Sequence, residues 1–224
     1  MNRIIVCGEI GSTHENKLDK ILRAVEIASE IGLDLIKFQL GTKHPNLTMP
    51  FEYFIKAYEH GKNLGMNVIS SVFDDDLLQA YISLKPAYTK FAYSQKDQVY
   101  NQELSINEGV PVIVSCDVLT RMQPVKEALK LFCVPQYPVV YKMDFSKLFK
   151  EMGFYGYSCH TLTTQEPKNA IRSGAMWIEK HFKIDDSVST PDSLFSVSVN
   201  EMKEIVDAAR YWENLKTKLE TVRG

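Results

Sequence analysis

Residues 26–39, EIASEIGLDLIKFQ, contain the pattern that decides the fold: an amphipathic helical stretch, a glycine, and a short apolar run that ends in polar residues. The glycine, Gly32, stands where the end of a helix favours a residue with a left-handed backbone. The apolar run after it is short and rich in β-branched or aromatic residues, as in a strand buried on both faces. This stretch predicts a helix that leads directly into a buried parallel strand.

The same pattern recurs along the chain, around Gly65, Gly109, Gly153 and Gly174. Repeated helix–glycine–strand units indicate alternating strands and helices in a parallel sheet. The apolar runs predict strands at Ile4–Ile10, Leu35–Leu40, Asn67–Val72, Tyr88–Tyr93, Pro111–Cys116, Leu131–Val134, Phe154–Ser158 and Trp177–Phe182.

Helical patterns separate these strands, among them Lys17–Ile31, Phe51–Leu64 and Val125–Leu131, and a last one, Val199–Leu219, closes the chain. Strand–helix units repeated eight times in 224 residues predict an α/β protein with one compact (β/α)₈ TIM barrel domain. A doubly wound open sheet is the structural alternative. It lacks support because residues 8–16, GEIGSTHEN, do not have the GxGxxG spacing of a dinucleotide-binding loop.

The composition is that of an ordinary soluble globular protein, with 45% hydrophobic residues, 24% charged residues and a net charge of −2. This balance gives no basic surface for nucleic acid and no polybasic membrane patch. No apolar run approaches the ~20 residues of a membrane-spanning helix, and the first residues do not form a secretory signal. We therefore expect a cytoplasmic protein. Free buried thiols are expected at Cys7, Cys116, Cys133 and Cys159, since none belongs to a CxxC pair.

Polar side chains gather at the predicted ends of the strands, where the active site of a βα barrel lies. They are Glu9, Lys37, Gln39, Ser70, Ser71, Asp74, Lys90, Ser115, Asp117, Gln136, Tyr137, Ser158, His160, Glu179 and His181. Residues two apart on a strand share a face. The pairs with this spacing are Lys37 with Gln39, Ser158 with His160, and Glu179 with His181.

Lys37 is the most informative of these residues, because a lysine inside an apolar strand is costly to bury unless it meets an anion. Lys90 has a similar setting. The strand-end histidines His160 and His181, each with a polar neighbour on the same face, indicate a shared divalent metal. Together these residues predict an anionic, phosphorylated substrate and a metal that polarises a carbonyl group.

An ordered set of segments is similar to the sialic acid synthase family, which includes N-acetylneuraminate, legionaminate and pseudaminate synthases. These segments are GEIGSTHENK, LIKFQ, SSVFD, TKFA, PVIVS, QYP, GYSCHT, IEKHF and TPDSLFS, and they extend over almost the whole chain. The resemblance implies a TIM barrel that condenses phosphoenolpyruvate with an N-acylated amino sugar. It also implies a divalent metal cofactor, typically Mn²⁺, with Mg²⁺ or Co²⁺ as alternatives.

The resemblance also implies roles for individual residues. His160 and His181 would be the metal ligands. The side chains that would bind phosphoenolpyruvate are Lys37, Lys90, Ser115, Ser158 and, as a further candidate, Ser71. Glu9 and Glu179 would lie beside the reacting centre with support from Gln39. The side chains that would contact the sugar are Asp192 and Tyr137.

The chain departs from the family pattern after the fourth predicted strand. The family has Lys-Ile-x-Ser-x-Glu there, and this chain has KFAYSQ at residues 90–95. Tyr93 therefore replaces a serine, and Gln95 replaces the acidic residue of the catalytic set. A neutral amide cannot act as a general base or supply negative charge.

A second departure concerns domain organisation. Members of the family continue into a small antifreeze-like domain that supplies an arginine to the sugar site of the partner subunit. Residues 1–224 are filled by the predicted barrel, so we expect no such C-terminal domain. A homodimer or a separate sugar-binding chain are the two expected partners for the sugar site.

Three functions are consistent with this sequence. The first is a carbon–carbon bond-forming transferase that adds phosphoenolpyruvate to an aldose or N-acyl amino sugar in the biosynthesis of a sialic-like (nonulosonic) acid. The second, motivated by Gln95, is a weakened or inactive barrel that binds a sugar or phosphorylated acid as a sensor or assembly subunit. The third is a different aldol-type or lyase barrel for another phosphorylated acid.

Overall fold

The structure is a computed structural model that describes residues 3–44, 47–120 and 124–223. Its eight strands are all parallel and pair in chain order, and β8 pairs with β1 to close the barrel. The strands are β1 (Ile5–Glu9), β2 (Leu35–Leu40), β3 (Asn67–Val72), β4 (Thr89–Phe91), β5 (Val112–Cys116), β6 (Leu129–Cys133), β7 (Gly156–Cys159) and β8 (Trp177–His181). The TIM barrel prediction is confirmed, and the open sheet is wrong.

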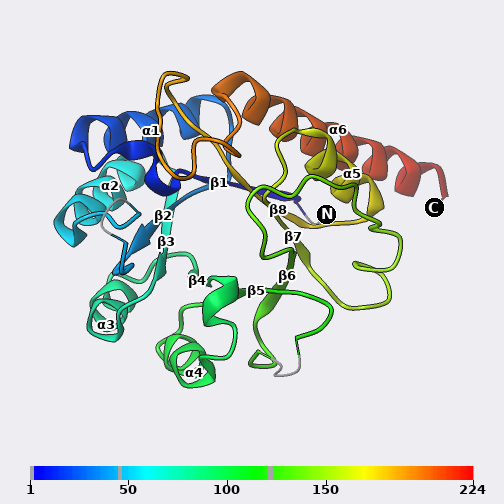
Figure 1. Cartoon of the computed structure of the whole chain (residues 1–224). Helices are drawn as coiled ribbons and strands as arrows, with labels where there is room; N and C mark the ends of the chain where they lie inside the picture. Colours follow the sequence, from blue (N-terminus) through cyan, green and yellow to red (C-terminus); the bar gives the residue numbers. More distant parts are fainter. Residues whose placement is uncertain (1–2, 45–46, 121–123, 224) are drawn as a thin grey trace.

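Helices surround most of the barrel (Figure 1). They are α1 (Leu18–Glu30), α2 (Phe51–Leu64), α3 (Asp75–Ser83), α4 (Val99–Asn107), α5 (Gln165–Ser173) and α6 (Val199–Arg223), with short 3₁₀ helices η1 (Gly11–His14) and η2 (Tyr93–Gln95). The five predicted helix-terminal glycines all have positive φ angles, between 70° and 113°. The predicted helix–glycine–strand pattern is confirmed at Gly32, Gly65, Gly109 and Gly174, whereas no α-helix precedes Gly153.

The prediction of a helix over Val125–Leu131 is wrong. In the described residues, the connections from β5 to β6 and from β6 to β7 contain no α-helix, and loops cover this side of the barrel in Figure 1. Only residues 117–128 separate β5 from β6, which leaves little room for a helix with two loops. Leu129 and Leu131 instead alternate with outward-facing residues as part of β6.

The barrel interior is filled near the N-terminal ends of the strands by an apolar set that we call the lower layer. It consists of Cys7, Leu35, Ile69, Ile113, Leu131 and Trp177, all buried. Gly156 on β7 makes room for the largest member, because a Cβ atom there would collide with the backbone oxygen of Trp177. A second apolar core lies between the strands and the surrounding helices. The lower layer therefore closes the barrel floor, as in other (β/α)₈ barrels.

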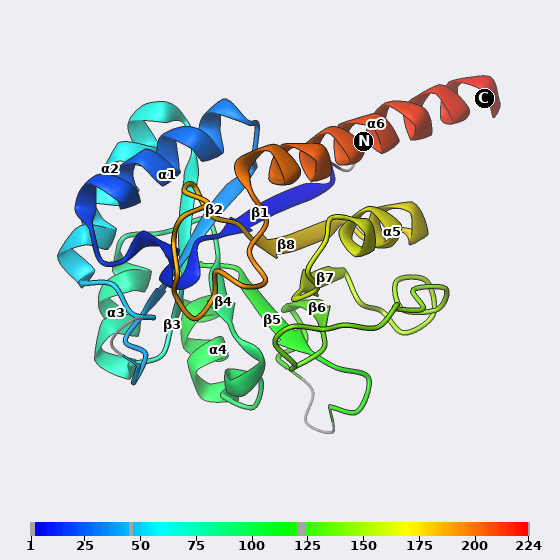
Figure 2. The ribbon, with the colours of Figure 1, turned by 45° about the horizontal axis from the view of Figure 1, so that its top comes forward.

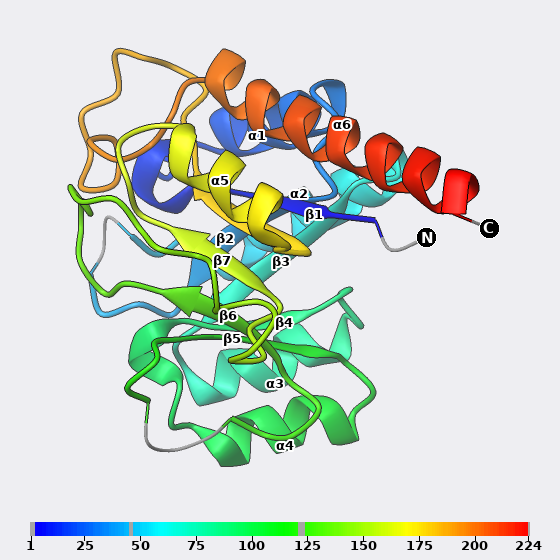
Figure 3. The same cartoon turned by 90° about the vertical axis from the view of Figure 1, so that its right-hand side faces the viewer.

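The loops that follow the strands lie together at one end of the barrel, on the left in Figure 3. α6 packs along the barrel and then extends beyond it at the opposite end, as Figures 2 and 3 show. Within the described residues, no helix combines the length and apolar character needed to cross a membrane. The prediction of free, buried thiols is confirmed for all four cysteines.

Candidate active site

Four ionisable side chains meet inside the barrel directly above the lower layer: Glu9, Lys37, Lys90 and Glu179, all buried. Lys37 forms an ion pair with Glu9, and its Nζ lies 3.7 Å from Oε1 of Glu179. The Nζ of Lys90 lies 3.6 Å from the same Glu179 oxygen. The arrangement comes from the strand period, because each residue follows an inward-facing residue by two positions.

The buried charges set one another's protonation. Burial alone would lower the pKa of Lys37, but Glu179 and Glu9 outweigh it and raise that pKa above its usual value. Burial raises the pKa of Glu9, and the neighbouring charge of Glu179 adds to this effect. For Glu179, burial would raise the pKa, yet Lys37 and Lys90 together lower it. Two carboxyl groups with pKa values moved in opposite directions suit different roles in acid–base chemistry.

Three serine hydroxyls complete this charged ring. Lys90 donates from Nζ to Oγ of Ser115 at 2.8 Å, and Lys37 donates to Oγ of Ser71 at 3.3 Å. Ser158 donates from Oγ to Oε1 of Glu179 at 3.1 Å. Ammonium and hydroxyl donors held in one ring are suited to an anion with several oxygens, such as a phosphate with a carboxylate. We call this ring the upper layer: Glu9, Lys37, Ser71, Lys90, Ser115, Ser158 and Glu179.

Two neutral imidazoles lie beyond the upper layer. The ring centroids of His160 and His181 are 5.8 Å apart. Burial lowers the pKa of His160 to about 4, and burial together with His160 places the pKa of His181 well below its usual value. Nδ1 of His160 donates to the backbone oxygen of Val134 at 3.1 Å, which leaves Nε2 with its lone pair. Nδ1 of His181 is buried and has no hydrogen-bond partner among the described residues.

These features fit a metal ion held by two protein nitrogens. Neutral imidazole is a common metal ligand, and a backbone acceptor on the second nitrogen orients it. Among the residues the structure describes, no group of three or more His, Cys, Asp or Glu side chains has the arrangement of a metal site. His160 and His181 therefore define at most a two-histidine donor set, which leaves positions open for substrate and water.

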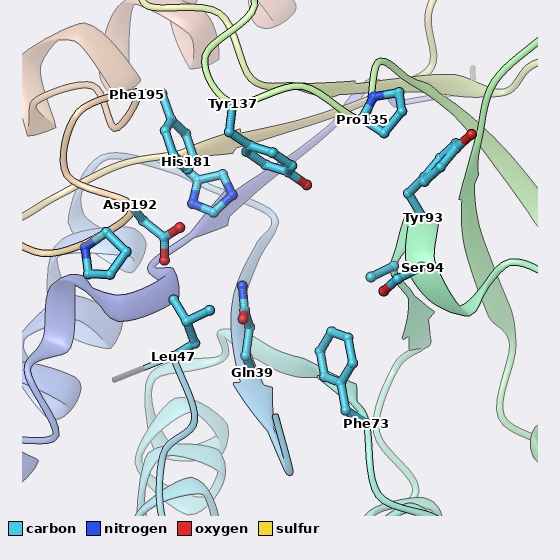
Figure 4. A pocket seen from close by; sticks show the side chains of 12 residues that line it. Gln39, Leu47, Phe73, Tyr93, Ser94, Pro135, Tyr137, His181, Asp192 and Phe195 are labelled. Atoms are coloured by element: carbon cyan, nitrogen blue, oxygen red, sulfur yellow. The ribbon is translucent and has the colours of Figure 1, made fainter. Parts of the chain in front are cut away.

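A pocket of about 510 Å³ opens above the upper layer and the two histidines (Figure 4). In Figure 4, His181 and Asp192 lie on one side, Gln39 rises from below, and Tyr93 and Ser94 form the opposite wall. The lining residues are Gln39, Leu47, Phe73, Ala92, Tyr93, Ser94, Pro135, Tyr137, His181, Pro191, Asp192 and Phe195. The polar groups are few and convergent among apolar walls, as in small-molecule sites.

Aromatic rings cover the two histidines. The ring of Tyr137 lies over His160 with a centroid distance of 4.0 Å. Phe195 meets His181 edge-on at 4.8 Å and approaches Tyr137 at 5.2 Å. These rings limit the access of water to the imidazoles. Sequence reasoning named Tyr137 but missed Phe195 and Phe73, which lie in loops where an apolar residue gives no signal of its own.

Asp192 reaches the pocket from the loop after β8. Its Oδ2 accepts a hydrogen bond from the backbone nitrogen of Ser12 at 2.6 Å, and the backbone nitrogen of Asp192 donates to Ser12 Oγ at 3.1 Å. Gly11 has φ of 51°, and a Cβ atom there would collide with the Asp192 carboxylate and press on His181. The Gly11 nitrogen also donates to Glu9 Oε1 at 2.7 Å. The GEIGSTH segment therefore shapes the site through its backbone.

Gln39 and Gln95 have different environments. Gln39 lines the pocket and donates from Nε2 to Oε1 of Glu9 at 3.4 Å. Gln95 lies behind the pocket wall, with both ends of its amide hydrogen-bonded to backbone groups. Its neighbour Tyr93 does line the pocket, and Tyr93 donates from its hydroxyl to Oδ2 of Asp117 at 2.9 Å.

Most predicted site residues thus come together at the strand ends. Three of the polar strand-end residues do not: Ser70 donates to the backbone oxygen of Phe38 at 3.0 Å, Asp74 caps α3 by accepting from Leu77 N at 2.9 Å, and Gln136 is exposed and does not line the pocket. Sequence reasoning missed that Cys133 faces the site, where its Sγ lies 3.8 Å from Nδ1 of His160. The available signal was its spacing of two from Leu131 on β6.

Comparison with known proteins gives consistent matches over most of the chain. A sequence profile of the NeuB family matches residues 41–220. Pseudaminic acid synthase from Campylobacter jejuni is 24% identical over an alignment of 255 positions, gaps included, that covers 95% of this chain and 74% of that protein. Spore coat polysaccharide biosynthesis protein SpsE from Bacillus subtilis is 27% identical over an alignment of 271 positions, gaps included, that covers 99% of this chain and 69% of that protein.

A solved structure shows the same fold. The N-acetylneuraminic acid (sialic acid) synthetase of Leptospira borgpetersenii superposes with a TM-score of 0.83 at 21% identity, over 96% of this chain and 85% of that one. At this level of identity the likeness shows a common barrel.

Proposed function

We propose that this chain, which belongs to the NeuB family, condenses phosphoenolpyruvate with an aldose or N-acyl amino sugar to make a sialic-like (nonulosonic) acid. One observation carries the proposal: a buried ring of two lysines and three serines lies directly beneath two neutral histidines and a pocket with aromatic walls. Relatives of the chain are synthases for acids of this kind, such as pseudaminic acid.

The upper layer would bind phosphoenolpyruvate. Lys37 and Lys90, with Ser115 and Ser158, present cationic and hydroxyl donors to the phosphate and carboxylate oxygens. The ammonium groups now neutralise Glu9 and Glu179. An incoming trianion would compete for them, so these contacts would loosen as the substrate enters. Burial makes such charge-assisted hydrogen bonds stronger than they would be in water.

His160 and His181 would hold the metal, with Mn²⁺ as the expected ion and Mg²⁺ or Co²⁺ as alternatives. When bound, it would act as a Lewis acid that polarises the carbonyl group of the open-chain sugar. Tyr137 and Phe195 would exclude water from this region, since their rings cover the imidazoles.

The reaction forms a bond between the methylene carbon of phosphoenolpyruvate and the carbonyl carbon of the sugar. The carbonyl oxygen of the sugar takes up a proton and becomes a hydroxyl group. Water then adds to the former enol carbon, and inorganic phosphate leaves by cleavage of the C–O bond to give the ketone; of the two protons of the water, one balances the new sugar hydroxyl and the other leaves with phosphate. Glu9, with its raised pKa, would take the proton from this water. Glu179 stays ionised and keeps both lysines in place. Asp192 and Gln39 face the pocket and would hydrogen-bond to the sugar hydroxyls.

The test is release of inorganic phosphate from phosphoenolpyruvate with Mn²⁺ and a panel of N-acyl hexosamines and aldoses. We expect release that requires both metal and sugar. No turnover with any acceptor, together with no Mn²⁺ binding that depends on His160 and His181, would contradict the proposal. An enzyme of another aldol or lyase type would reveal itself by turnover of a different phosphorylated acid.

A binding protein without synthase chemistry is the second candidate, and Gln95 favours it because position 95 carries a neutral amide where the resemblance implies an acid. Calorimetry separates the two candidates. A binder would take up phosphoenolpyruvate with the lysines intact and release no phosphate with any sugar, whereas the synthase would bind phosphoenolpyruvate and release phosphate when the sugar is added.

A further inference from the structure

Gln95 joins two neighbouring strands of the barrel through one side-chain amide. It closes the 3₁₀ helix η2, which follows β4, and its side chain is buried. Nε2 donates to the backbone oxygen of Val72, at the end of β3, at 2.6 Å. Oε1 accepts from the backbone nitrogen of Ala92, just after β4, at 3.2 Å. The end of β3 and the turn after β4 are therefore tied together by one side chain.

These two strand ends form one wall of the pocket. Ala92, Tyr93 and Ser94 line it from the turn after β4, and Phe73 lines it from the position directly after β3. Lys90 of the upper layer lies on β4, two residues before Ala92. Gln95 lies behind this wall and does not line the pocket itself; its side chain is bonded to Val72 and Ala92, which are next to or part of the wall. Its contacts set where Ser94 and the ring of Tyr93 stand relative to the lysine.

The chemistry of these two hydrogen bonds requires an amide. One end must donate to a carbonyl oxygen and the other must accept from an N–H group, and a neutral carboxamide does both. A carboxylate only accepts, so one of its oxygens would face the Val72 carbonyl in a buried place. A protonated carboxylic acid can donate again.

The charged groups around Gln95 are engaged with other partners. The pairs are Lys96 with Asp97 at 3.1 Å, Lys90 with Ser115 at 2.8 Å, Tyr93 with Asp117 at 2.9 Å, and Asp75 with Asn101 at 2.9 Å. Within the part of the chain that the structure describes, Gln95 has one further side-chain contact, to Gln98 Oε1 at 3.4 Å. Among the residues that the structure describes, no lysine or arginine forms a hydrogen bond with the Gln95 side chain, so none is in place to stabilise a carboxylate at position 95.

We propose that Gln95 is a positioning residue whose neutral amide fixes the Ala92–Ser94 wall of the pocket, and that a carboxylate at this position supports the site only while it is protonated. This inference goes against a role for position 95 as acid or base. The expected change in KM for phosphoenolpyruvate rests on the proposed function, whereas the expected change in amide hydrogen exchange does not.

The chain contains a matched control in Gln102 of α4. Gln102 is also fully buried, donates from Nε2 to the backbone oxygen of Lys96 at 3.0 Å, and accepts at Oε1 from the backbone nitrogen of Val125 at 3.2 Å. It does not line the pocket. Gln102→Glu therefore makes the same chemical change in the same kind of setting, but at a residue whose partners, Lys96 and Val125, do not line the pocket.

The experiment compares Gln95→Glu, Gln102→Glu and wild type between pH 5 and pH 8, by amide hydrogen exchange over residues 89–95 and by KM and kcat for phosphoenolpyruvate. For Gln95→Glu we expect near wild-type behaviour at pH 5. At pH 8 we expect exchange in this segment to be about tenfold faster and KM to be about tenfold higher, with a smaller change in kcat, as for one lost buried hydrogen bond. Gln102→Glu should lower the melting temperature at pH 8 without changing KM or exchange at residues 89–95.

A rate at pH 8 that rises in Gln95→Glu, or a KM that stays at the wild-type value, would overturn the proposal, and so would an equal KM shift in Gln102→Glu. If Gln95→Glu does not fold at pH 8, Gln95→Met provides the second variant, in which exchange and KM should rise about equally at both pH values. If the wild type neither binds nor turns over phosphoenolpyruvate, the proposed function fails. The exchange measurement still decides whether Gln95 holds the wall.

Discussion

The lower and upper layers of the barrel interior lie two residues apart on the same strands, yet they differ completely in chemistry. Cys7, Leu35 and Trp177 fill the lower layer, and Glu9, Lys37 and Glu179 stand directly above them. Both layers are buried. Burying apolar surface stabilises the fold, whereas burying charges costs free energy that their mutual attraction offsets only in part. The lower layer therefore stabilises the barrel, whereas the upper layer costs stability and, in the proposed function, serves substrate binding and chemistry.

The largest effect should come from His181, above both layers. His181→Ala should abolish metal binding and lower kcat/KM by about 10³-fold or more, since metal polarisation is worth several kcal/mol. Stability should change far less than activity. His14→Gln is the matched control, because His14 is also buried after a strand but does not line the pocket. Activity that survives in His181→Ala with tight Mn²⁺ retention would refute the metal assignment.

The lower layer should show the opposite behaviour. Leu131→Ala leaves a cavity in the barrel floor and should lower the free energy of unfolding by about 2–5 kcal/mol in urea titrations. The KM and kcat of the folded fraction should stay close to wild type. Leu119→Ala, at a side chain that is 80% exposed, should change stability by less than about 0.5 kcal/mol. If Leu131→Ala lost activity while its free energy of unfolding stayed near the wild-type value, the proposed difference between the two layers would be contradicted.

Lys37→Ala tests the upper layer itself. Loss of a charge-assisted contact to phosphoenolpyruvate should raise its KM by about 10- to 100-fold with a smaller change in kcat. Steady-state kinetics at saturating sugar and Mn²⁺ measure both parameters. An unchanged KM with a reduced kcat would assign Lys37 to the chemical step instead of substrate binding.

The smallest effect concerns acid stability. Burial lowers the pKa of His14 from 6.5 to about 4. Below pH 6.5 the unfolded chain therefore binds a proton that the folded chain does not. The free energy of unfolding thus decreases as the pH is lowered from about 6.5 to about 4. Between pH 8 and pH 5.5 this group should cost about 1 kcal/mol. His14→Gln should reduce the pH dependence by that amount in urea titrations. An identical pH dependence in both proteins would contradict the burial argument.

The sequence was sufficient for the barrel because a glycine precedes five of the eight strands (β2, β3, β5, β7 and β8) and an apolar run marks all eight. β2 and β3 begin and end where the apolar runs do, at Leu35–Leu40 and Asn67–Val72. The sequence was insufficient for the connections around β6, because the apolar spacing over Val125–Leu131 fits a helix as well as a strand. Only the short span between β5 and β6 decides against the helix.

The same contrast holds within the site. Lys37 and Lys90 were identifiable because a lysine in an apolar strand needs an anion, and the structure supplies Glu9 and Glu179. Phe195 carries no such signal, since an apolar loop residue can face anywhere. The contacts of Gln95 were equally hidden, because they go to the backbone of another strand. Tertiary contacts of this kind follow only from the closed barrel.

The most direct test of the central claim is a crystal structure of the protein with Mn²⁺ and phosphoenolpyruvate. We expect one metal ion bound by His160 and His181, and the phosphate and carboxylate oxygens of phosphoenolpyruvate on Lys37, Lys90 and the serines of the upper layer. Metal bound elsewhere, or phosphoenolpyruvate outside the upper layer, would contradict the account.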